Sequence, residues 1–148
     1  MGSQTAAGSA LAISAGIPAT QDAVGFAALT FTEIGQIEKI GSIGSTFAKV
    51  DFQPLKGAKQ KHKGSVDYGS LQPSLAHDDT DAGQTLLRTA AENQIALYAF
   101  KVTLADGAIR YFQGRVFGYP ETIDNADSIV MAAPTVEINT KPIKVAAV

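Results

Sequence analysis

The spacing of apolar and polar residues predicts a chain built mainly of β-strands. A short apolar segment covers residues 10–14, and residues 46–52 alternate, with Lys49 and Asp51 on the face opposite Val50. Such a period of two is typical of a strand with one covered face. Alternation returns over residues 65–72, and further strands are predicted within residues 98–118 and 128–140.

Residues 26–41 leave two interpretations open. Phe31 and Glu33 alternate with Thr32 and Ile34, which favours a strand, and a change of phase at Gly35 predicts a β-bulge. A helix is the rival interpretation. Two glycines and the entry Thr-Phe-Thr argue against it, because these residues have low helix propensity.

A β-hairpin is predicted around the pair Asp106-Gly107, which is favoured in two-residue type I′ turns. Such a turn would place Val102 opposite Tyr111 and Phe100 opposite Gln113. The second strand is apolar on both faces, so it needs cover on both sides. The cover would come from a helix or from a neighbouring subunit, and the candidate subunit-interface aromatics are Tyr111, Phe112 and Phe117.

One helix is predicted over about residues 80–93. Leu86, Leu87 and neighbouring alanines form an apolar stripe at helical spacing, and Asn93 can end the helix. Gly83 lowers its intrinsic stability by about 1 kcal/mol relative to Ala. The candidate N-caps are Asp78, Asp79 and Thr80, and Asp81 suits the positive end of the helix dipole.

These elements predict a mainly-β fold: a β-sandwich or barrel with one flanking α-helix. A chain of 148 residues is expected to form one domain, over residues 9–148. Residues 1–8, rich in small side chains, are expected to be a flexible N-terminal tail. The last eight residues, Lys-Pro-Ile-Lys-Val-Ala-Ala-Val, are expected to be extended.

Composition narrows the chemistry. The chain has no cysteine, which excludes disulfides, thiolate metal sites and cysteine nucleophiles. Its net charge is −2 and its isoelectric point is near 5.6, values that disfavour a protein that wraps DNA. No apolar run reaches the roughly 20 residues of a membrane span, so no membrane partner is expected.

A long basic inter-strand loop is predicted over about residues 54–64. It holds Lys56, Lys59, Lys61 and Lys63, four of the nine lysines of the chain, together with His62. Nucleic-acid binding is disfavoured, since no aromatic ring other than His62 is interleaved with the lysines for base stacking. Two interpretations stay open: a solvated loop, and a loop that docks on an acidic patch of another copy.

No pattern of catalytic, cofactor-binding or metal-binding residues is recognisable. The segment His77–Asp81 lacks the spacing of an EF-hand and is better explained as a helix N-cap in a charged turn. The chain has no nucleophile elbow, no phosphate-binding loop and too few ligands for zinc. We therefore expect neither enzyme activity nor a cofactor.

The succession of segments resembles one known family. In order, the segments are LAISAGIPATQDAVGFAALTFTEIGQIEKIGSIGSTF, FQPLKGAKQKHKGSVDYGSL, DDTDAGQTLLRTAAE and FKVTLADGAIRYFQGRVFGY. The succession resembles the major tail tube protein of long-tailed, non-contractile bacteriophages, over about residues 9–139. No single motif is diagnostic, and residues 133–148 depart from the pattern.

The resemblance implies a structural virion protein, a β-sandwich whose copies form hexameric rings that stack into the tail tube. The tube is the conduit for DNA delivery into the host, and DNA passes through its lumen without specific binding. The implied partners are other copies of the chain, tape-measure proteins, and tail-tip or terminator proteins. The implied location is the virion tail, after assembly in the host bacterial cytoplasm.

The resemblance also implies roles for charged residues. The basic loop would reach an adjoining subunit or ring, where its cations would pair with acidic residues and fix the register. A lumen lined by lysine would hold DNA, so the basic loop is expected to face away from it and acidic residues to face it. The candidate acidic docking or lumen residues are Glu33, Glu38, Asp51, Asp67, Asp78, Asp79, Asp81 and Glu121.

Two alternatives remain beside the phage tail tube. One is a non-enzymatic β-sandwich module for carbohydrate or host recognition, although the absence of Trp disfavours sugar stacking. The other is the tube subunit of a bacterial injection or secretion system. A small esterase or metallo-hydrolase is opposed by the missing triad and ligand sets.

Overall fold

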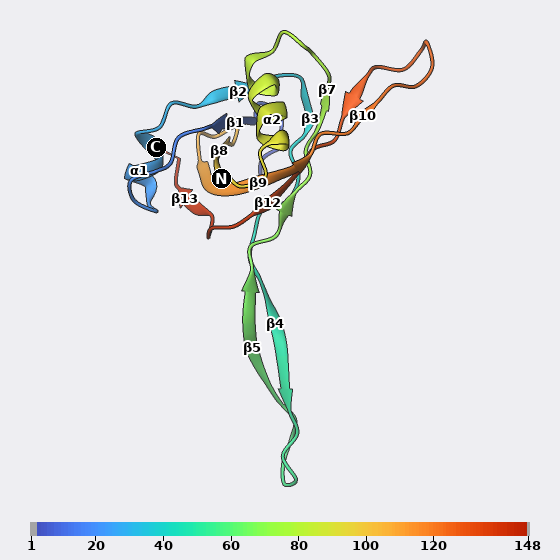
Figure 1. Ribbon diagram of the computed structural model, residues 1–148. Helices are drawn as coiled ribbons and strands as arrows, with labels where there is room; N and C mark the ends of the chain where they lie inside the picture. Colours follow the sequence, from blue (N-terminus) through green and yellow to red (C-terminus); the bar gives the residue numbers. More distant parts are fainter. Residues whose placement is uncertain (1–2, 148) are drawn as a thin grey trace.

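The computed structural model describes residues 3–147 and shows two antiparallel sheets, two helices and a projecting two-stranded arm (Figure 1). The mainly-β fold class is therefore confirmed. The first sheet has the strand order β2-β1-β8-β9-β12-β6. β12 and β13 pair with different halves of the same edge of β9. Its strands are β1 (Ala10–Ser14), β2 (Thr32–Ile34), β6 (Ser70–Leu71), β8 (Tyr98–Thr103), β9 (Ile109–Gly118), β12 (Thr135–Ile138) and β13 (Ile143–Val145).

The second sheet has the order β10-β11-β7-β3. Its strands are β3 (Ile37–Lys39), β7 (Ser74–Ala76), β10 (Glu121–Thr122) and β11 (Met131–Ala132). Helix α2 (Ala82–Glu92) packs against β9, β2 and β1. The main core joins both sheets and α2, and its fully buried members include Leu11, Ile13, Leu71, Leu75, Leu87, Phe100, Phe112 and Val136.

A smaller apolar cluster covers the other face of the first sheet. Helix α1 (Ala23–Ala27) places Phe26 against Tyr111 and Ala99, and Phe31 and Ile143 pack around them. Asp22 caps α1, because its Oδ1 accepts from the Gly25 amide at 2.8 Å. The two faces of β9 are thus covered from within the chain, which explains why this strand is apolar on both sides.

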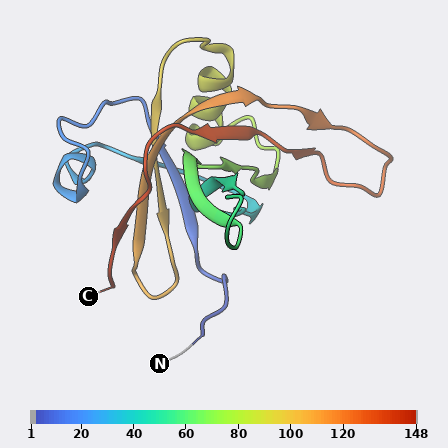
Figure 2. The ribbon, with the colours of Figure 1, turned by 90° about the horizontal axis from the view of Figure 1, so that it is seen from below.

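The arm consists of β4 (Thr46–Phe52) and β5 (Gln60–Asp67), which within residues 3–147 pair only with each other. It projects away from the two sheets (Figures 1 and 2). A register shift between Phe47 and Lys49 marks a bulge in the ladder. The predicted loop over residues 54–64 is therefore wrong in its second half, since residues 60–64 belong to β5. Lysine and glutamine are poor strand formers, so propensity alone did not indicate this strand.

The β8–β9 hairpin forms, but its predicted register is wrong by one residue. Phe100 pairs with Phe112 and Lys101 with Tyr111. The Leu104 amide donates to the Ala108 carbonyl oxygen at 2.8 Å, so three residues lie between this closing pair, and of these only Gly107 has a positive φ, of 96°. A type I turn followed by one left-handed residue has this form, whereas the predicted type I′ turn needs two such residues.

Two further expectations needed correction, and a third was incomplete. Residues 26–41 hold a helix end and two strands in different sheets, so Gly35 marks a change of sheet instead of a bulge. The N-cap of α2 is Asp81, which excludes the three candidate caps before it. The C-terminal segment is extended but also pairs with β9 through β13.

The predicted N-terminal tail falls partly outside the described residues, because residues 1 and 2 are not described. Residues 3–8 are exposed, and a turn links the Ser9 amide to the Ala6 carbonyl oxygen at 3.0 Å. Gln4 Nε2 also donates to Asp106 Oδ2 at 3.1 Å, near the tip of the β8–β9 hairpin.

Candidate assembly surface

The arm is the most exposed part of the described chain. Every residue from 46 to 67 is exposed except Pro54 and Gly64, which are half-buried. Apolar side chains are among them: Phe47, Val50, Phe52 and Leu55 each expose half or more of their surface. A two-stranded hairpin that stands alone is marginally stable in water, and large exposed apolar groups mark interaction sites. The arm is therefore a candidate surface for contact with another molecule.

The two faces of the arm differ in chemistry. Cross-strand pairs place Lys49 opposite Lys63 and Asp51 opposite Lys61, which gives a cationic face. The other face carries the pairs Val50 with His62 and Phe52 with Gln60. Contact with a partner can therefore bury apolar surface on one face and select charge on the other.

The cationic face is only partly neutralised within the chain. Asp51 Oδ2 lies 3.8 Å from Lys49 Nζ and 3.7 Å from Lys59 Nζ. Lys63 Nζ lies 4.7 Å from the centre of the Phe47 ring, in a cation–π contact. Lys49 and Lys63 repel each other across the strands, because like charges directly opposite are unfavourable.

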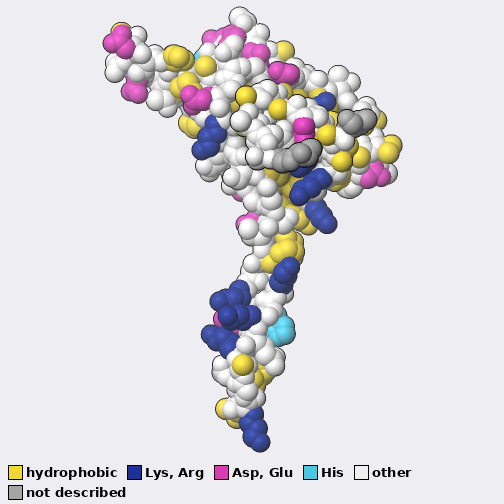
Figure 3. Space-filling model, turned by 180° about the vertical axis from the view of Figure 1, so that it is seen from behind, with side chains coloured by type: hydrophobic (Ala, Val, Ile, Leu, Met, Phe, Trp, Pro, Cys, Tyr) yellow, Lys and Arg dark blue, Asp and Glu magenta, His cyan; other side chains and the backbone are white. Residues whose placement is uncertain are grey.

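Charge is divided sharply between the arm and the rest of the chain. Residues 46–67 hold five lysines and two aspartates, a formal charge of +3. Since the whole chain has −2, the remaining residues have −5. Figure 3 shows a concentration of basic side chains along the arm and most of the visible acidic side chains on the body. The overall acidity that disfavoured DNA binding thus conceals a strongly basic projection.

The predicted loop residues do lie together on this projection. Lys56 and Lys59 lie in the connection between the strands, and Lys61, His62 and Lys63 lie in β5. All five side chains are exposed. His62 lies on the apolar face, opposite Val50, and so is separated from the lysines on either side of it.

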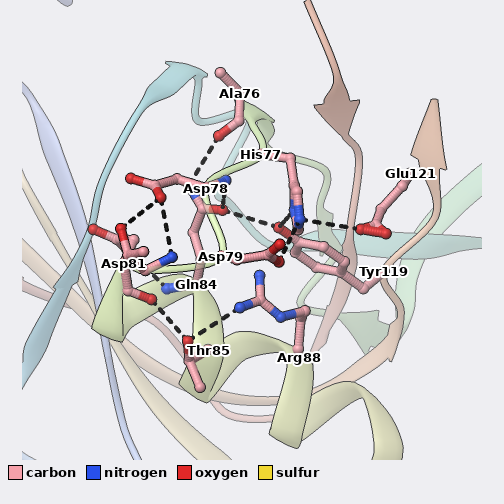
Figure 4. Close-up of polar contacts among 11 residues, drawn as sticks. Ala76, His77, Asp78, Asp79, Asp81, Gln84, Thr85, Arg88, Tyr119 and Glu121 are labelled. Atoms are coloured by element: carbon pink, nitrogen blue, oxygen red, sulfur yellow. Dashed lines mark hydrogen bonds and ion pairs between the residues drawn. The ribbon is translucent and has the colours of Figure 1, made fainter. Parts of the chain in front are cut away.

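The predicted acidic residues are dispersed. Glu33 and Glu38 are exposed on β2 and β3. Asp51 belongs to the arm, and Asp67 lies at its root, where its Oδ1 accepts from the Gly69 amide at 2.8 Å. The remaining four are Asp78, Asp79 and Asp81, near the start of α2, and Glu121, on β10. Figure 4 shows them as one polar cluster.

His77 is at the centre of this polar cluster. Its Nε2 lies 2.7 Å from Asp79 Oδ1 and 3.4 Å from Glu121 Oε1. Tyr119 links the cluster to α2, because its hydroxyl donates to Gln84 Oε1 at 3.1 Å. Burial raises the pKa of the Tyr119 phenol. The cluster therefore joins the strand β10 to the start of α2 (Figure 4).

Asp81 and Asp78 are engaged with the backbone of their own chain. Asp81 Oδ2 accepts from the amides of Gln84, at 2.9 Å, and Gly35, at 3.1 Å. Asp78 Oδ1 accepts from the Thr80 hydroxyl at 2.7 Å, and this hydrogen bond lowers the pKa of Asp78. These contacts explain His77–Asp81 as a capping segment. Among residues 3–147, no group of three or more His, Asp and Glu side chains could hold a metal ion.

The three candidate subunit-interface aromatics differ in their exposure. Tyr111 and Phe112 are buried within the chain, on opposite faces of β9, so neither presents surface to a neighbour. This corrects their predicted role: α1 and the main core supply the cover that a neighbouring subunit was expected to provide. Phe117 is 69% exposed and is available for contact.

A second projecting surface was missed from the sequence. The β10–β11 hairpin, residues 121–132, extends from the body away from the arm (Figures 1 and 2). It exposes Ile123 and Ile129 beside Asp124 and Asp127. No element was predicted from the sequence between residues 118 and 128. The signal that could have found the hairpin is the pair of isoleucines flanking a polar turn.

No known family model matches the chain, and no curated protein matches it in sequence. Solved structures do resemble it. A chain in the sheath/tube terminator of PVC, an extracellular contractile injection system, in the extended state matches at a TM-score of 0.73 and 8% identity. A chain in the six-fold symmetrised baseplate of the anti-feeding prophage gives the same values, and both alignments cover 99% of this chain and 99% of the other.

A third match is a chain in the PVC sheath–tube complex in the extended state. It covers 74% of this chain and 87% of its own length, at a TM-score of 0.54 and 11% identity. At these identities the likeness shows the fold alone, which the chain shares with chains of these phage-tail-like assemblies. Among residues 3–147, no helix is long and apolar enough to span a membrane.

Proposed function

We propose that the protein is a structural subunit of a phage-like tail, whose copies form rings that stack into a tube. The observation that carries this proposal is the arm. It has no covering layer within the described chain, yet it exposes five large apolar side chains: Phe47, Val50, Phe52, Leu55 and Val66. Burial of these groups against another copy would stabilise both the arm and the assembly.

The solved structures that share the fold support this role. Their assemblies contain tube, sheath and baseplate components, and the anti-feeding prophage baseplate was six-fold symmetrised. Six copies in a ring are therefore part of the proposal. The tail would belong to a non-contractile bacteriophage, as the sequence resemblance implies, or to a bacterial injection system. Its partners would be other copies, a tape-measure protein and terminator or tip proteins, and no enzymatic role is proposed.

The charge distribution supports a conduit that does not hold DNA. The arm carries +3 and the rest of the chain carries −5. If contacts between copies bury the arms, the surface that remains to line a lumen is acidic and repels phosphate. Glu33 and Glu38 are the lumen candidates of this proposal, because both are exposed and neither lies on the arm.

Negative-stain microscopy at raised protein concentration tests the proposal, with rings or hollow tubes as the expected result. A matched variant replaces residues 47–66 with an Asn-Gly turn, because Thr46 and Asp67 are already paired. It should keep the circular dichroism of the body and remain a monomer. A wild-type chain that stays monomeric at every concentration would contradict the proposal, and glycan binding by that monomer would favour the recognition module.

A further inference from the structure

We infer that the cationic arm of one copy docks on the β10–β11 hairpin of a neighbouring copy. This inference rests on the proposed function and adds to it the surface that receives the arm. The earlier expectation gave the arm a set of eight acidic residues as possible docking sites. The structure excludes most of them as docking sites. Asp51 and Asp67 lie on the arm itself. Asp78, Asp79 and Asp81 are hydrogen-bonded within the capping segment.

The two surfaces have opposite and equal formal charge. Residues 121–132 contain Glu121, Asp124 and Asp127 and no lysine or arginine, which gives −3 against the +3 of the arm. Glu121 is partly engaged by His77. Asp124 and Asp127 lie in the connection beyond it, and neither has an ion-pair partner within residues 3–147. They are therefore available to cations from another chain.

The two surfaces also match in apolar character. Ile123 and Ile129 expose 75% and 71% of their surface on the hairpin, and Leu55 is fully exposed at the end of the arm. Phe52 adds a half-exposed ring on the arm. Apolar contact between the two would remove these side chains from water, while the lysines and aspartates would set orientation and partner choice.

Both surfaces also have free strand edges that can form backbone hydrogen bonds with another copy. β10 is the edge strand of the second sheet, and each strand of the arm has one unpaired edge. Unpaired strand edges are templates for pairing with another chain. An arm could therefore add to the edge at β10 with backbone hydrogen bonds as well as side-chain contacts.

One copy cannot satisfy this contact by itself. The arm and the β10–β11 hairpin project from the body in different directions, and their tips lie far apart in both views (Figures 1 and 3). The contact must join different surfaces of two copies, head to tail. Such heterologous contacts close into rings or continue as open stacks, which is the geometry that a tube requires.

Cysteine cross-linking tests the contact, because the chain has no native cysteine. Leu55→Cys protein and Ile123→Cys protein are mixed at an assembling concentration and oxidised. We expect a disulfide-linked dimer containing one chain of each. The matched control pairs Leu55→Cys with Val24→Cys, which is 77% exposed on α1. If assembled samples give no more mixed dimer than this control, the inference is wrong although the proposed function stands. A wild-type chain that never assembles would contradict both.

A charge exchange provides an independent test. Lys61→Glu with Lys63→Glu, and separately Asp124→Lys with Asp127→Lys, should each reduce the assembled fraction at least fivefold. The chain with all four substitutions should recover most of it, since every arm then meets a hairpin of opposite charge. All sites are exposed, so the melting temperature should stay at the wild-type value. A four-substitution chain as defective as the two parents would overturn the inference.

Discussion

The ring of Tyr111 stacks on the ring of Phe26, with centroids 5.3 Å apart and ring planes 14° apart. Both rings are buried, and burial raises the pKa of the Tyr111 phenol. The contact joins the short helix α1 to the face of β9 that the main core does not cover. A five-residue helix has little stability of its own, so this contact holds α1 in place.

Removal of the Phe26 ring should therefore destabilise the subunit strongly. We expect Phe26→Ala to lower the free energy of unfolding by about 3–5 kcal/mol, the usual cost of deleting a buried phenyl group. Urea denaturation measures the change. Val24→Ala on the same helix is the control, because Val24 is exposed and its loss should cost less than about 0.5 kcal/mol. Equal losses for the two variants would mean that α1 does not cover β9.

Gly83→Ala should destabilise the protein although alanine is the better helix former. Propensity alone predicts a gain of about 1 kcal/mol. A Cβ on Gly83 would collide with the carbonyl oxygen of Glu33 on β2, which is backbone and cannot rotate away. We expect a net loss of roughly 1–3 kcal/mol, as for overpacked sites.

Thr89→Ala is the matched control for Gly83→Ala, since Thr89 is exposed in the same helix. Its effect on the urea midpoint should be small. A Gly83→Ala variant that melts above the wild type would show that α2 does not approach β2 this closely.

The stability of the subunit should depend on the charge of Asp22. The hydrogen bond from the Thr20 hydroxyl, with a smaller contribution from the Gly25 amide, lowers the pKa of Asp22. A lowered folded-state pKa contributes stability above the unfolded pKa of about 3.9 and loses it as the pH falls through the folded value. Asp22→Asn should therefore melt below the wild type near neutral pH, and the difference should shrink towards about pH 2. A pH-independent difference would exclude the charge as its cause.

Local sequence patterns predicted much of the secondary structure outside the arm. The apolar segment at residues 10–14 is β1, and the helix expected over residues 80–93 is α2, shortened at its start because Asp81 is the cap. The β8–β9 hairpin was found from Asp106-Gly107. Its register was wrong because Asp106 does not adopt the positive φ that a type I′ turn needs.

The other elements depend on tertiary contacts, which local sequence patterns do not show. Helix α1 has five residues and no apolar period long enough to detect, and it exists through Asp22 and Phe26. The changes of sheet at Gly35 and at Pro134 separate strands that looked continuous in the sequence. The surface proposed to receive the Lys56–Lys63 segment was not predicted either, because that hairpin, residues 121–132, lies far from the segment in the sequence.

The apolar side of the arm should matter for assembly and not for the fold of the body. We expect Phe52→Ser with Leu55→Ser to abolish ring or tube formation while the thermal melting curve stays unchanged, because both residues are exposed and contact no core. Sedimentation measures the assembled fraction. Ile17→Ser is the control, since Ile17 is 75% exposed in a loop outside both projections. Normal tubes from the double variant would exclude an apolar contact at the arm.

Residues 46–67 should lose their exposure only when copies join. Amide hydrogen exchange, measured on the same protein in dilute solution and after assembly, tests it most directly. In dilute solution the arm should exchange among the fastest segments, because its ladder is a lone hairpin. After assembly we expect protection of the arm by about tenfold or more. Arm amides that exchange equally fast in both samples, or a protein that never assembles, would contradict it.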